Sequence, residues 1–243
     1  MSIRDFNNQV ESLWAAYFGC AADDLGREGT TLMPLERLQG SRLIHVVYIR
    51  KRALAEIDPA LQLDAERALA EAGGKAVLSS ELLQRLWGSD RIGEVEAGLI
   101  FHLRPGELVR PELEPGFMLR RLTPQDQQAL DTLRRGCTEY EIDDAYVEIE
   151  HELAWGCFKG EALAAVGSAY RRNGFMDYGV LTDPAYRGQG LARHVVCALT
   201  DDTLQLGLIP QYRCNRVNKA SRRVAEAAGF ALYYTTEGVT LKG

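Results

Sequence analysis

The sequence predicts an α/β protein with two segments, and three observations lead to this fold class. Stretches with the helical spacing of apolar residues alternate with short apolar stretches typical of strands. Pro105, Pro111 and Pro115 lie close together, and because proline disrupts both helix and sheet, they mark a connector. Farther along, a strand pattern runs through glycines into a long helix pattern. The expected domains are a smaller mixed α/β domain at 1–113 and a second α/β domain at 114–243.

The first segment mixes helix and strand signals. Apolar residues between 6 and 17 fall on one helical face, and 42–50 has the apolar run of a strand. Glycine ends a helix pattern at 64–74, a serine begins another at 79–88, and 97–103 reads as a strand. The segment holds no combination of residues typical of catalysis, so the sequence assigns it no role.

The second segment begins with a strand at 117–122. Thr123 then caps a helix, with proline at its first position and Asp126 three residues after the cap. The apolar spacing predicts a second helix at 142–153, whose other face carries stacked carboxylates. These carboxylates belong to Asp144, Glu148 and Glu152.

Eight further elements are expected before the end of the chain. Turn residues separate strands at 155–160, 162–170 and 175–182. A helix to residue 206, a strand at 209–214, a helix at 218–228 and a hairpin of strands at 231–236 and 238–242 complete the order.

The stretch D-P-A-Y-R-G-Q-G-L-A-R-H-V-V, residues 183–196, joins a strand to a helix. Unpaired main-chain N–H groups at a helix start attract anions, and glycine allows a ligand to approach the backbone closely. Arg187 adds a positive charge. The P-loop pattern is absent, and a dinucleotide-binding loop would need a small residue where Arg193 stands. The stretch is therefore either a cradle for the pyrophosphate of a coenzyme, which is the interpretation we favour, or an ordinary glycine-bearing turn before a helix.

Composition excludes several classes of protein. A net charge of −6 argues against nonspecific nucleic-acid binding. No apolar run is long enough to span a membrane, and the first residues contain no apolar signal core, so we expect a cytoplasmic protein without a membrane partner. The five cysteines form no C-x-x-C pair, which favours reduced structural thiols and no metal site.

Charge is unevenly distributed in the second segment. Residues 136–158 contain seven acids and no lysine or arginine, whereas 213–223 contains four arginines, one lysine and no acid. This polarity indicates either two ligand regions of opposite charge or two solvated faces.

Two motifs in the second segment resemble those of the GNAT superfamily of N-acetyltransferases. Residues 187–192, R-G-Q-G-L-A, fit the pattern Q/R-x-x-G-x-G/A, and 218–230, N-K-A-S-R-R-V-A-E-A-A-G-F, resembles the second signature of that superfamily. The resemblance covers roughly residues 116–243. It implies the GNAT fold, a mixed, mostly antiparallel sheet flanked by helices, here preceded by the smaller α/β domain.

The resemblance also implies a binding site for acetyl-CoA as co-substrate. Val180, Leu181 and Thr182 would pair with the pantetheine arm as an added strand does. The amides from Arg187 to Arg193 would hold the pyrophosphate, and Asn218 and Ser221 would contact the coenzyme near its thiol end. The loop residues are Arg187, Gly188, Gln189, Gly190, Leu191, Ala192 and Arg193. The 3′-phosphate would meet the basic cluster of Arg213, Arg216, Lys219, Arg222 and Arg223.

The activity implied is acetyl transfer to a primary amine by direct attack in a ternary complex. Candidate bases are Asp177, on the strand before the loop, and Glu152, on the acidic helix. Ala225 stands where members of the family commonly have a tyrosine that acts as general acid. Tyr233 and Tyr234 are therefore candidate proton donors. The carboxylates of the expected helix favour a small, cationic amine as acceptor.

Two alternatives stay open at this point. One is a non-catalytic module that binds or senses acetyl-CoA, which the alanine at position 225 makes conceivable. The other is an acetyltransferase that acts on a protein amine. The sequence also leaves the oligomeric state open, with a homodimer as one option.

Overall fold

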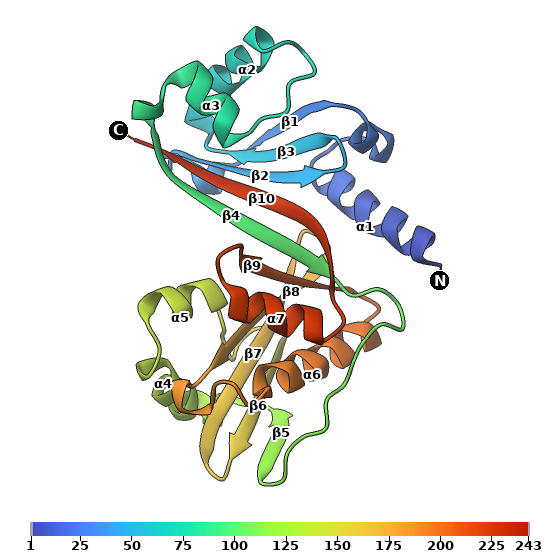
Figure 1. Cartoon of the computed structure of the whole chain (residues 1–243), viewed down its shortest axis with the longest axis vertical. Coiled ribbons are helices and arrows are strands. Elements are labelled where there is room, and N and C mark those ends of the chain that lie inside the picture. Colours follow the sequence, from blue (N-terminus) through green and yellow to red (C-terminus); the bar gives the residue numbers. More distant parts are fainter. Residues whose placement is uncertain (1, 243) are drawn as a thin grey trace. The chain divides into compact units, whose positions relative to one another are not determined.

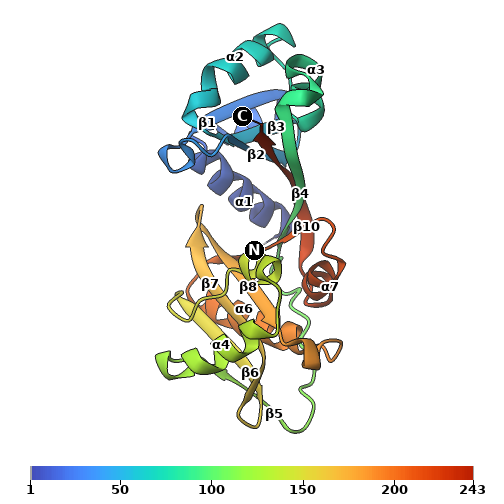
Figure 2. The ribbon, with the colours of Figure 1, turned by 90° about the vertical axis from the view of Figure 1, so that its left-hand side faces the viewer.

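The computed structural model describes residues 2–242, which form alternating helices and strands (Figures 1 and 2). Contacts within the chain divide it into two compact units. The C-terminal unit holds Phe101–Cys214 and Asn218–Leu232, and the N-terminal unit holds Arg4–Ile100, Asn215–Val217 and residues from Tyr233 onward. Strand pairing is mostly antiparallel, with parallel pairs at β1/β3 and β8/β9. The expected mixed, mostly antiparallel sheet flanked by helices is thus confirmed.

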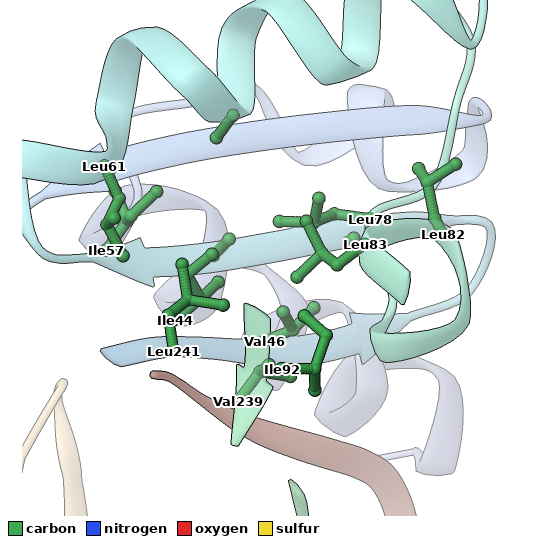
Figure 3. Close-up of a cluster of buried hydrophobic side chains, with 13 residues drawn as sticks. Ile44, Val46, Ile57, Leu61, Leu78, Leu82, Leu83, Ile92, Val239 and Leu241 are labelled. Carbon is green, nitrogen blue, oxygen red and sulfur yellow. The ribbon is translucent and has the colours of Figure 1, made fainter. Parts of the chain in front are cut away.

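The N-terminal unit consists of five strands in the order β1-β3-β2-β10-β4, with helices on both faces (Figure 1). The strands are β1 (Gly29–Pro34), β2 (Leu43–Ile49), β3 (Arg52–Ile57), β4 (Ile92–His102) and β10 (Ala231–Leu241). The helices are α1 (Ile3–Tyr17), α2 (Gln62–Glu71) and α3 (Ser80–Trp87). Alternating residues of the strands point toward α2 and α3, and together they form a buried apolar cluster (Figure 3). Its labelled members are Ile44, Val46, Ile57, Leu61, Leu78, Leu82, Leu83, Ile92, Val239 and Leu241.

The end of the chain corrects one expectation. Instead of a hairpin, β10 is a single strand of 11 residues that continues through Gly238. Its residues Thr235 to Thr240 pair with β2, and Val239 and Leu241 enter the cluster of Figure 3. Residues 233–242 therefore group with the N-terminal unit.

The C-terminal unit has strands in the order β9-β8-β7-β6-β5. They are β5 (Phe117–Arg121), β6 (Leu153–Lys159), β7 (Ala162–Arg172), β8 (Phe175–Thr182) and β9 (Ile209–Asn215). The helices are α4 (Gln127–Arg135), α5 (Glu139–Ala145), α6 (Leu191–Gln205) and α7 (Lys219–Ala227). The expected capping box precedes α4, where Asp126 accepts from the Thr123 amide at 2.8 Å. The connector, 103–116, contains neither helix nor strand.

Side-chain alternation places the helices of this unit on two faces of the sheet. Val166 and Leu181, which lie opposite each other on β7 and β8, pack against Leu130 and Leu133 of α4. Tyr178 lies three residues before Leu181 on β8, so its side chain points to the opposite face of the sheet. There its hydroxyl donates to Thr203 of α6 at 2.8 Å. The α4–α5 face and the α6 face therefore sandwich β7 and β8.

The expected acidic helix at 142–153 is wrong. Helix α5 ends at Ala145, and Tyr146 follows with φ +43° in the left-handed region. The chain turns here because the carbonyl of Ala145 lies against β8 at Gly179; an ideal Cβ on that glycine would sit 1.8 Å from this oxygen. Glu148 and Glu152 consequently lie outside the helix, and the three acids do not form a stripe.

Candidate active site

A cavity opens where β8 and β9 part. The two strands pair in parallel only from Phe175↔Ile209 to Tyr178↔Tyr212, although β8 continues to Thr182 and β9 to Asn215. On its other edge, β8 stays paired with β7 up to Thr182. The edge of Gly179–Thr182 that faces β9 is therefore open to an extended ligand, and a cavity of ≈ 390 Å³ lies beside it.

Most of the residues expected to bind coenzyme A line this one cavity. They are Val180, Leu181, Thr182, Arg187, Gly188, Gly190, Leu191, Ala192, Asn218 and Ser221. Gln189 and Arg193 are not among the lining residues. The Arg193 guanidinium instead donates to the carbonyl of Val109 in the connector, at 2.9 and 3.2 Å.

The glycine loop has the geometry of an anion cradle. Gly188 and Gly190 have φ angles of +79° and +76°, a region that favours glycine, and Gly190 is the N-cap residue of α6. Nothing lies within 4 Å of the position of a Cβ on either glycine. The amide of Arg193 donates to the carbonyl of Gly190 at 3.0 Å, whereas the amides before it at the start of this 15-residue helix have no partner within the helix. The helix dipole adds positive potential at the same point. The loop is suited to hold phosphate oxygens.

The start of α7 forms the opposite bank of the cavity. The Asn218 side chain accepts from the Ser221 amide at 3.0 Å, and its Nδ2 donates to Asp144 on α5 at 3.3 Å. The Ser221 hydroxyl lies 2.9 Å from the hydroxyl of Tyr212, which also lines the cavity. Burial raises the pKa of Tyr212, so this phenol stays protonated.

The four residues expected to transfer protons do not line the cavity. Asp177 is 1% exposed and accepts from the Arg213 guanidinium at 2.5–2.9 Å. Glu152 is exposed and pairs with Arg171 at 2.8 Å. Tyr233 and Tyr234 belong to the N-terminal unit, where Tyr233 donates to Asn7 at 2.7 Å and Tyr234 is buried. The two acids thus stabilise neighbouring arginines.

The basic cluster is also divided among different roles. Arg213 is held by Asp177, and Arg222 pairs with Glu226 at 2.8 Å. Arg213 and Arg223 both line the cavity, but the guanidinium of Arg213 is engaged by Asp177. Among the arginines of this cluster, Arg223 is therefore the one best placed for a phosphate group of the ligand.

Sequence reasoning missed several residues that the structure brings to the cavity. Tyr140, Glu141, Tyr186 and Tyr212 line it, together with Asp144, which the sequence had placed among the carboxylates of the expected acidic helix. Glu141 forms an ion pair with Arg187, Oε1 to Nη2, at 2.9 Å. Tyr212 carries no local signal in a strand of mostly apolar residues, and Glu141 was part of an acidic stretch that gave no indication of its partner.

A histidine next to the cavity was missed as well. His151 Nδ1 lies 2.8 Å from the hydroxyl of Ser168, whose partner across the β7/β8 pair is the cavity-lining Gly179. The imidazole contacts the rings of Tyr146 and Tyr170, with centroids 5.1 and 4.8 Å away. Partial burial lowers the pKa of His151, so its ring is neutral at physiological pH.

Two classes of feature are absent from the described part of the chain. Residues 2–242 contain no group of three or more histidine, cysteine or carboxylate side chains placed to hold a metal ion. Within the same residues, no helix combines the length and the apolar character needed to cross a membrane.

Comparison with known proteins specifies the class of protein to which this fold and cavity are similar. Residues 157–238 match the model of the family described as GNAT acetyltransferase. This range contains both motifs and the strands that part. The resemblance of the C-terminal region to the GNAT superfamily is therefore confirmed, and with it the prediction of an acyltransferase.

Solved structures of GNAT proteins share the fold. A GCN5-related N-acetyltransferase from Sphaerobacter thermophilus is 12% identical, with 96% of this chain and 91% of that chain covered and a TM-score of 0.56. One from Kribbella flavida is 16% identical, covering 97% and 95%, with a TM-score of 0.53. A GNAT-family acetyltransferase from Colwellia psychrerythraea is 19% identical, covering 77% and 76%, with a TM-score of 0.52. No curated protein matches the chain.

Proposed function

We propose that the protein is an acetyl-CoA-dependent N-acetyltransferase that acetylates a primary amine of a small, cationic acceptor. The observation that carries this proposal is the cavity at the point where β8 and β9 part, with the cradle of Gly188 and Gly190 on its rim. Acetyl-CoA would supply the thioester whose carbonyl carbon the amine attacks.

The chain's own groups fit this co-substrate along its length. The open edge of Gly179–Thr182 offers main-chain groups to the two amides of a pantetheine arm. The amides at the start of α6 match a diphosphate, and Arg223 on the opposite bank is suited to a further phosphate. A main-chain amide near Leu181 would polarise the thioester carbonyl.

Proton transfer is best assigned to two residues outside the original candidates. We infer that His151 accepts the proton of the acceptor ammonium, since its ring is neutral and Nε2 has no hydrogen-bond partner among residues 2–242. Tyr212, coupled to Ser221, is the hydroxyl that would return a proton to the leaving thiolate. Its position on the cavity supports catalysis despite Ala225, which is fully buried.

The charge that would attract a cationic acceptor lies in fewer groups than the sequence indicates. Glu148 is paired with Arg134 at 2.8 Å, and Glu152 is paired with Arg171. Asp144 remains on the cavity, and Tyr146 exposes its ring beyond the end of α5, where a cation can lie over it. These two groups support an acceptor of small size and positive charge.

The test combines turnover with coenzyme affinity. Free thiol is measured after a panel of small amines is added to acetyl-CoA and protein, and the dissociation constant of coenzyme A is measured by calorimetry. Gly190→Asn keeps a residue that tolerates positive φ but adds a side chain to the cradle, so we expect affinity to fall at least about tenfold, or about 1.4 kcal/mol.

Gly207→Asn is the matched control, because Gly207 lies at the other end of α6 with φ +70° and nothing within 4 Å of its Cβ position. We expect it to leave coenzyme affinity unchanged. Binding without thiol release on any amine would favour a non-catalytic module. Turnover on peptides alone would favour a protein acceptor, and equal affinities for the two variants would contradict the assigned cradle.

A further inference from the structure

The cavity assigned to an anionic coenzyme carries two carboxylates on its rim. Glu141 and Asp144 lie three residues apart on α5, so they share one face of that helix. Glu141 reaches Arg187, before α6, at 2.9 Å, and Asp144 accepts from Asn218, before α7, at 3.3 Å. The acidic side chains of α5 thus contact both the segment before α6 and the segment before α7, which lie on two sides of the cavity.

The contact of Glu141 uses the part of Arg187 that a phosphate needs. Arginine binds a phosphate in a bidentate manner through Nη2 together with either Nη1 or Nε. Here Nε donates to the carbonyl of Thr182 at 3.2 Å, and Nη2 contacts both Glu141 Oε1 and the sulfur of Cys137, at 2.9 and 3.9 Å. A bidentate phosphate contact therefore requires that Nη2 give up one of these partners, and the carboxylate is the one that a diphosphate would repel.

Glu141 is held in this position from its own helix. Its Oε2 accepts from the amide and the hydroxyl of Thr138, at 2.9 and 3.1 Å, in a capping box. The hydrogen bond from the Thr138 amide, followed by the contact with Arg187, keeps the pKa of Glu141 below its ordinary value, although burial acts in the opposite direction. The carboxylate is therefore ionised throughout the physiological range, and it neutralises Arg187 when no ligand is bound.

We propose that Glu141 is a resident counter-ion of Arg187 that the diphosphate of the coenzyme displaces, so that coenzyme binding breaks one of the two side-chain contacts that hold α5 at the rim of the cavity. The inference rests on the proposed function. Since α5 ends at the turn of Tyr146, beside His151 and Tyr170, the loss of the Glu141 contact would loosen the helix next to the side on which the acceptor is expected to bind.

Glu141→Gln is the variant that separates charge from structure. Glutamine also serves at the third position of a capping box, so the helix start is kept while the negative charge is lost. Asp143→Asn is the matched control, because Asp143 lies on the same helix, is exposed and does not line the cavity. Dissociation constants are measured at low salt for coenzyme A, for ADP as a diphosphate probe and for pantetheine, which has no diphosphate.

We expect E141Q to bind coenzyme A and ADP about fivefold more tightly than the wild type, with pantetheine unchanged and with all D143N affinities within about twofold. Hydrogen exchange on the unmodified protein gives a second measurement that needs no variant. The amides of Glu139–Ala145 should exchange faster once coenzyme A is added.

Opposite results would assign Glu141 a different role. If E141Q binds coenzyme A equally or more weakly, or if α5 exchanges more slowly with ligand, Glu141 orients Arg187 for the phosphate and the exchange of anions is overturned. If the wild type binds neither coenzyme A nor ADP, the proposed function itself fails. The two failures are thereby distinguished.

Discussion

At the scale of single residues, the charged groups around the cavity differ in what holds them. Asp177 and Arg213 form a pair in which the carboxylate is 1% exposed and receives three contacts of 2.9 Å or less. Among residues 2–242, the ring of His151 has one hydrogen-bond partner, Ser168, and burial lowers its pKa. The first arrangement stabilises the fold, and the second leaves a nitrogen available to accept a proton.

These differences predict opposite effects for two substitutions. Asp177→Asn leaves the partly buried Arg213 without its counter-ion, so we expect the free energy of unfolding to fall by about 2 kcal/mol. His151→Gln removes the proton acceptor, so we expect kcat to fall about 100-fold with unfolding changed by less than about 0.5 kcal/mol. Urea denaturation and steady-state kinetics with an accepted amine measure the two effects.

The pH profile distinguishes a proton acceptor from a residue that only supports the site. Because burial lowers the pKa of His151, the wild-type rate should stay level down to below the ordinary histidine range and fall only at lower pH. This acid limb should disappear in His151→Gln. Glu152→Gln, at an exposed ion pair, serves as the control and should change neither rate nor stability. An unchanged acid limb in His151→Gln would assign the proton to another group.

At the scale of elements, local sequence signals were sufficient for some parts and insufficient for others. Helices α6 and α7 were predictable because their starts depend on residues within the same stretch, the glycines before α6 and Asn218 before α7. The end of α5 depends on Gly179, which lies 34 residues beyond Ala145, and no local pattern contains that contact. The cavity-lining residues of the glycine loop and of α7 were therefore predictable from motifs, and the residues that α5 contributes to the cavity were not.

Gly179→Ala tests the contact that ends α5. The added methyl group would lie 1.8 Å from the Ala145 oxygen and 3.0 Å from its carbon, both main-chain atoms, so the helix must move. We expect the free energy of unfolding to fall by about 1–3 kcal/mol in urea denaturation. Gly74→Ala is the control, because nothing lies within 4 Å of its Cβ position and its φ is not in the left-handed range. Equal free energies of unfolding for the two variants would show that α5 can move away from β8 without destabilising the protein.

At the scale of the whole molecule, the order of the strands in the sheet differs from their order along the chain. Each unit is assembled from separate stretches, and the N-terminal unit takes its fourth strand in the sheet order from the end of the chain. The connector prolines indicated a break near residue 113, but they carry no information about the partner of β10. That partner is β2, nearly 190 residues earlier, and such a long-range pairing leaves no trace in local composition.

The division of the chain can be tested with fragments of the N-terminal unit. A chain of residues 1–113 lacks β10, so it loses the buried Val239 and Leu241 and leaves one edge of β2 unpaired. Each lost side chain is worth about 2 kcal/mol, a large share of the 5–15 kcal/mol typical of a domain, and we expect no cooperative unfolding in urea.

Joining residues 231–243 to residues 1–102 through a flexible glycine–serine linker should restore a cooperative transition. The same fusion with Val239→Asp and Leu241→Asp should not, because the charges would be buried among apolar side chains. A two-state transition for residues 1–113 alone would show that the N-terminal unit is complete without the end of the chain.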